Sequence, residues 1–80
     1  MPVTYHVVVP FGRDDEGNLV PLEPSEAPTV DAAKRRARAA AEKNAGAVAF
    51  SRTGDLATGE FDEAQVIAVY GAVDVGMLGG

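Results

Sequence analysis

The stretch that decides the fold is residues 29–46, which read TVDAAKRRARAAAEKNAG. Its two ends have the features of helix boundaries. The Thr29 hydroxyl can cap free N–H groups, Pro28 disfavours an earlier turn, and Gly46 can take the left-handed conformation that ends a helix. At about 100° per residue, charges fall on one side and small residues on the other. The small face comprises Val30, Ala33, Ala37, Ala40, Ala41 and Asn44. We therefore predict an amphipathic helix that packs closely on another element.

Alternating apolar residues predict strands on both sides of this helix. The alternation runs through residues 3–11 before the helix, and through residues 47–53 and 65–73 after it. Residues 19–22 predict a short edge strand, because Pro21 has no N–H to donate to a central ladder. The predicted fold class is α+β, with one amphipathic helix packed on a three- to four-stranded sheet and the element order β-(β)-α-β-β.

One helix covers only one face of such a sheet, so the two faces should differ in role. We expect the bulky face to meet the helix; its members are Val7, Val9, Phe11, Val48, Phe50, Ile67 and Val69. The other face would present His6, Val8, Ala49, Ser51, Val66 and Tyr70. It is too apolar for water and too small-residued for a second deep core, so we predict that it is a dimer face. A one-residue bulge would exchange the two sets.

The length of 80 residues predicts one domain over residues 1–75, followed by a flexible glycine-rich tail over residues 76–80. So short a chain buries only about 60% of its unfolded surface. Without cysteine, neither disulfides nor thiolate metal ligands can stabilise the fold, and a homodimer is the remaining common solution. We expect the Pro- and Glu-rich residues 21–28 to be mobile. The apolar run over residues 7–11 is too short for a bilayer, so we expect a soluble cytoplasmic protein without membrane contact.

Charge is distributed unevenly along the chain. The net charge is 7 − 12 = −5, yet residues 29–45 carry 5 − 2 = +3, which leaves 2 − 10 = −8 elsewhere. The candidate binding residues on the helix are Lys34, Arg35, Arg36 and Arg38. They suit an acidic protein partner, and a nucleic-acid-binding module is the alternative. We do not expect nucleic acid, because the chain is acidic overall and no aromatic residues lie between the arginines.

A second candidate anion site lies at residues 51–55, which read SRTGD. Arg52, with neighbouring hydroxyls and turn amides, could hold a carboxylate or a phosphate. The same composition is explained by a turn in which Thr53 and Asp55 bond their own backbone and Gly54 supplies a positive φ. Both interpretations stay open at the level of the sequence.

No segment carries a catalytic, cofactor or metal signature. Residues 14–18 contain three carboxylates, but their glycine comes too early for a calcium loop and a hydrated turn explains them. His6 is the only histidine, so a transition-metal cluster is not expected. His6 and Ser51 can share a sheet face, yet no orienting acid lies near either in sequence. We predict a protein that is not an enzyme and has no catalytic residues, no metal and no cofactor.

The C-terminus ends in Gly79 and Gly80 after a strand. With the order hairpin, helix, strands and Gly-Gly tail, the chain resembles the β-grasp carrier proteins of the ubiquitin and bacterial sulfur-carrier type. The resemblance implies a terminal carboxylate that is activated by adenylation and then holds sulfur or forms an amide. The helix departs from that family in having alanines where such carriers place larger apolar residues. Our main prediction remains a small non-catalytic binding or regulatory domain that acts through protein–protein contacts as a homodimer.

Overall fold

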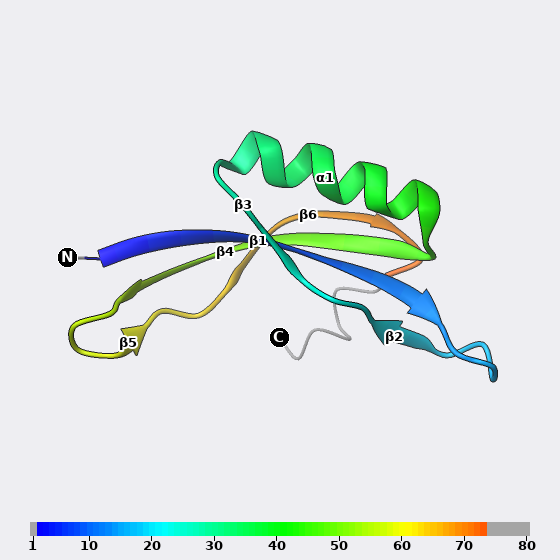
Figure 1. Ribbon diagram of the computed structural model, residues 1–80, viewed down its shortest axis with the longest axis horizontal. Helices are drawn as coiled ribbons and strands as arrows, with labels where there is room; N and C mark the ends of the chain where they lie inside the picture. Colours follow the sequence, from blue (N-terminus) through cyan, green and yellow to red (C-terminus); the bar gives the residue numbers. More distant parts are fainter. Residues whose placement is uncertain (1, 74–80) are drawn as a thin grey trace.

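The computed structural model describes residues 2–73 and is an α+β fold (Figure 1). One helix lies on a curled antiparallel sheet of six strands, rather than the three or four predicted. The elements are β1 (Pro2–Arg13), β2 (Leu19–Pro21), β3 (Ser25–Ala27), α1 (Val30–Lys43), β4 (Gly46–Asp55), β5 (Glu60–Phe61) and β6 (Gln65–Gly71). The two additional strands are β3 and β5.

The long strands β1 and β4 form the centre of the sheet. They pair antiparallel from Pro2 opposite Asp55 to Phe11 opposite Gly46. Each central strand carries two further strands along its outer side, β2 and β3 on β1, and β5 and β6 on β4. The sheet is therefore four ribbons wide, with β2 and β3 along one edge and β5 and β6 along the other.

The predicted start of the helix is confirmed, whereas the prediction for its end is wrong. The Thr29 hydroxyl accepts a hydrogen bond from the Ala32 N–H at 3.0 Å, as an N-cap does. At the other end, the Asn44 side chain donates to the Ala40 carbonyl. Gly46 does not have a positive φ and begins β4. It must be glycine because a Cβ there would lie 2.6 Å from Val73 Cγ2 and 2.8 Å from a backbone oxygen.

The prediction of which sheet face meets the helix is also wrong. Helix α1 packs on the small-residue face, where Val8 and Ala49 lie with Ala33 and Ala37 at 2% exposure or less. An alanine face approaches most closely where the facing surface is also small, so the two small surfaces pack on each other. The bulky residues lie on the opposite face in a second cluster. That cluster contains Phe11, Val48 and Val73, with Val9, Leu19, Phe50 and Val69 around them.

A bulge in β6 exchanges two of the predicted side chains between faces. The β4–β6 register pairs Ala49 with Ala68 and Phe50 with Val66, so Ile67 is the extra residue. Ile67 packs against the cluster beneath α1. Val66 lies instead in the same row as Phe50 on the opposite face, because directly paired residues share a face.

Part of the segment predicted to be mobile is an ordered strand. Strand β3 pairs with His6–Val8 of β1, and Ala27 at its end is 3% exposed in the core. The predicted tail, residues 76–80 with Gly79 and Gly80, lies outside the described residues. Within residues 2–73, no helix has the length and apolar character needed to cross a membrane.

Candidate functional site

The predicted dimer face is not a free surface. Val8 and Ala49 are buried under α1, and Tyr70 is half-buried against the same cluster. Val66 lies on the opposite face and is 44% exposed. These positions correct the predicted dimer surface, because the residues that were to meet a second copy meet the helix of their own chain.

His6 and Ser51, two further members of that predicted face, form a polar row beyond the helix. His6 Nδ1 lies 2.7 Å from the Ser51 hydroxyl, so the prediction that they share a face is confirmed. In the next row, the hydroxyls of Thr4 and Thr53 are hydrogen-bonded at 2.8 Å. These bonds join side chains of paired strands and so tie β1 to β4. In the part of the chain that the structure describes, no group of three or more His, Cys, Asp or Glu residues could hold a metal ion.

An apolar surface lies on the face opposite α1, at the end of the sheet nearer β5. The strand register places its side chains in adjacent rows. We call this surface the open patch; it comprises Val3, Tyr5, Val7, Phe50, Phe61 and Val66. Three of its members, Val3, Phe61 and Val66, are between 39% and 44% exposed.

An aromatic cluster holds one end of the open patch together. The Phe61 ring lies on Gly54, where a Cβ would come within 2.0 Å of the ring. The ring centroids of Tyr5 and Phe61 are 6.4 Å apart, and Arg52 Cζ lies 5.2 Å from the Phe61 centroid. Arg52 Nε also donates to the Asp62 carbonyl at 2.9 Å. Arg52 therefore fixes Phe61 of β5 and the chain that leaves this strand.

This geometry corrects the interpretation of residues 51–55 as a turn. The segment belongs to β4, and the turn follows it, with Gly59 at φ 75°. The prediction that Asp55 bonds its own turn is confirmed, because its carboxylate accepts the Ala57 N–H at 2.9 Å. Gly54 is required by the Phe61 ring and not by a positive φ. A shallow depression of about 250 Å³ beside it has Asp55, Glu60 and Asp62 in its lining. Three carboxylates at this end disfavour an anion, so the anion site at Arg52 is not supported by its surroundings.

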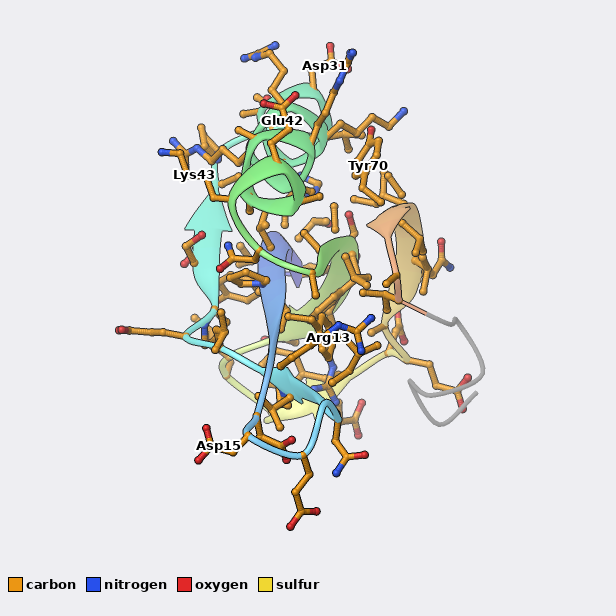
Figure 2. The ribbon with its side chains drawn as sticks, turned by 90° about the vertical axis from the view of Figure 1, so that its right-hand side faces the viewer. Arg13, Asp15, Asp31, Glu42, Lys43 and Tyr70 are labelled. Carbon is orange, nitrogen blue, oxygen red and sulfur yellow. The ribbon has the colours of Figure 1, made fainter. Side chains whose placement is uncertain are left out.

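The basic residues of α1 are exposed; Arg35 lies on the outer side of the helix, away from the buried face, and the others divide between its two flanks. Arg36 donates to the Glu26 carbonyl at 2.8 Å and therefore leans over β3. Lys34 and Arg38, each two residues away, lie about 160° around the helix from Arg36, on the flank above β6. Figure 2 shows Lys43 on the β3 side of the helix and Tyr70 rising from β6 on the other side.

Sequence reasoning missed two features, the close approach of a group to Gly54 and the unprotected edge of β6, although the sequence indicates each of them. Gly54 stands in an alternating strand segment, which indicates that another group approaches the backbone closely. The seven residues of β6 contain neither charge nor proline, and such a sequence leaves a sheet edge unprotected.

Comparisons with protein-family models, with curated proteins and with solved structures found no match for this chain.

Proposed function

We propose that the protein is a small non-catalytic binding domain that acts through protein–protein contacts and dimerises through the open patch. The observation that carries this proposal is the exposure of Val3, Phe61 and Val66 on one face, beside half-buried Tyr5 and Phe50. Exposed apolar side chains gathered on one face are typical of interaction sites.

A second copy of this chain suits the open patch. The rows of the patch carry two charged residues of opposite sign, Arg52, which contacts Phe61, and Glu26, which pairs with Val7, so two patches can face each other with little net repulsion. Two such faces pack about 10 Å apart, as in a β-sandwich. Three ribbons and three rows present about 300 Å² per copy, less than half of the about 800 Å² per partner in a standard interface. We therefore expect a weak dimer that exchanges with the monomer.

The test is the molar mass in solution by sedimentation equilibrium, over protein concentrations from about 10 μM to about 1 mM. We expect a dimer at the upper end whose stability is insensitive to salt, because apolar contacts are not screened. The double variant Val3→Lys/Val66→Lys should be monomeric throughout, since each change places a charge on the patch.

A matched control carries the same substitutions off the patch. Leu22 and Val30 are 39% and 38% exposed, close to the exposure of the two patch residues. The variant Leu22→Lys/Val30→Lys should therefore dimerise like the wild type. A wild-type protein that stays monomeric at the highest concentration, or a control that loses the dimer as fully as the patch variant, contradicts the proposal.

A further inference from the structure

The outer side of β6 is an unpaired sheet edge within residues 2–73. In this range β4 is the only strand that pairs with β6, so the backbone groups on the other side of β6 have no strand partner. The strand reads QVIAVYG and has no charged side chain or proline that would block a further strand. An extended segment could therefore hydrogen-bond along it and extend the sheet.

The charge above this edge indicates what kind of segment fits. Lys34 and Arg38 are exposed, and their positions around α1, about 160° from Arg36, place them on the flank over β6. Figure 2 shows Tyr70 rising from β6 beside the helix. Below the edge, on the opposite face, lie Val66 and Val69. Side chains of an added strand alternate between the two sides. Acidic residues on the helix side and apolar residues on the other side would therefore meet complementary surfaces.

A second copy of this chain fits the edge less well. Two β6 strands paired by a two-fold axis would bring the Lys34 and Arg38 pairs of both copies over the same junction. Four cations would then face one another. An acidic strand bound to one copy would instead neutralise both of its cations. The edge shares Val66 with the open patch, so a dimer formed there covers this apolar contact and leaves the outer main-chain groups of β6 and the two cations above them available.

We propose that the β6 edge, with Lys34 and Arg38 above it, docks an extended acidic segment of a partner protein by strand addition. Main-chain hydrogen bonds to β6 provide affinity, and the two cations select carboxylates on alternate residues. This site goes beyond the dimer of the proposed function and does not depend on it.

The test uses three fluorescein-labelled ten-residue peptides and fluorescence anisotropy with the full chain. One alternates valine and glutamate, the second alternates valine and lysine, and the third is the glutamate peptide with N-methyl groups on alternate backbone amides. We expect saturable binding of the first peptide below about 1 mM, weakened by added salt. The lysine peptide should not bind, and the N-methylated peptide should lose at least about tenfold in affinity, because it cannot donate to the edge.

Two charge-matched variants place the site on one flank of the helix. Lys34→Glu/Arg38→Glu should weaken binding of the glutamate peptide at least about tenfold, because both cations above β6 are reversed. Arg36→Glu/Lys43→Glu makes the same change in net charge on the β3 side, and its affinity should stay within about threefold of the wild type. Circular dichroism of both variants verifies that α1 is retained.

Three results would overturn the proposal. Equal binding of the N-methylated peptide would show an electrostatic contact without strand addition. Equal losses in the two charge variants would place the peptide elsewhere on the helix. A wild-type dimer that the peptide converts to monomer would show that β6 edges pair with each other. A failure of the open-patch dimer leaves the first two results interpretable, since both are measured on the binding of the peptide.

Discussion

The two edges of the sheet are built in opposite ways. On one edge, β2 and β3 contain three residues each, and Pro21, Glu23 and Pro24 lie at or between them. On the other edge, β6 runs for seven residues without a proline or a charge. Prolines, charges and short strands are the means by which proteins prevent unwanted pairing. The comparison indicates that one edge is closed to further strands and that the other is open to them.

The edges also differ in how tightly they hold the central strands. Leu22 lies over Gly12 of β1, where a Cβ would sit 3.3 Å from the nearest leucine atom. Phe61 lies over Gly54 of β4, where a Cβ would sit 2.0 Å from the ring. Both side chains are 39% exposed. The closer of these two contacts is made by β5, which lies along the same edge as β6, so this packing holds β5 on β4 at the end of the open edge.

The largest expected loss of stability comes from substituting Gly71, which ends β6. The matched position for comparison is Gly17, in the loop before β2. Both have a positive φ, 76° and 82°, which costs an L-residue about 1–2 kcal/mol. A Cβ at Gly71 would lie 2.6 Å from the Ala45 carbonyl oxygen, whereas one at Gly17 has no neighbour within 4 Å. Gly71→Ala should therefore lower the free energy of unfolding by about 3 kcal/mol and Gly17→Ala by about 1 kcal/mol, measured in urea. Equal losses would contradict the close approach at Gly71.

Much of this fold follows from the sequence. The start of α1 at Thr29, the long strands and the α+β class are predicted by capping and alternation. The wrong sheet face follows from matching a small helix face to the bulkiest strand residues, whereas close packing favoured small on small. Strand β3 lies in a proline-rich segment and β5 has two residues, so neither shows an alternation long enough to detect.

The candidate site could be predicted only in part, for a related reason. The basic residues of α1 can be found from composition alone. Their division between two flanks depends on the Arg36 contact with the Glu26 carbonyl, which joins segments that no local pattern links. The open patch likewise depends on the bulge at Ile67, because that extra residue turns Val66 to the open face. Alternation predicts faces only while the register has no insertion.

A smaller difference should separate Phe61 from Leu22. Phe61→Ala removes a ring that contacts Tyr5, Arg52 and Gly54, and should lower the free energy of unfolding by about 2 kcal/mol. Leu22→Ala removes a smaller side chain of the same exposure and should cost about 1 kcal/mol. Both are measured by urea unfolding. If Leu22→Ala lowers the free energy of unfolding more than Phe61→Ala does, the edge formed by β2 and β3 is the better packed of the two.

The open edge should also govern aggregation of partly destabilised protein. Val66→Lys adds a charge to β6 and should slow light-scattering growth a few-fold in mild urea. Leu22→Lys adds the same charge on the other edge and should change the rate by less than about twofold. Each variant is compared at a urea concentration that gives the same unfolded fraction. A reduction by Leu22→Lys that matches that of Val66→Lys would show that net charge, and not the edge, controls the rate.

The smallest effect concerns Asp14, in the loop that leads to the closed edge. The backbone N–H of Asn18, 2.9 Å from the carboxylate, is the main cause that holds the pKa of Asp14 below its ordinary value. Because the folded pKa is the lower one, the ionised carboxylate adds stability above the unfolded pKa, and this is lost as pH falls through the folded pKa. NMR titration should give a depressed pKa for Asp14. Asp14→Asn should lower Tm slightly near neutral pH and not in strong acid, whereas Asp15→Asn, at a side chain that points outward in Figure 2, should do less. A difference between Asp14→Asn and wild type that grows in acid would contradict the role given to the Asn18 N–H.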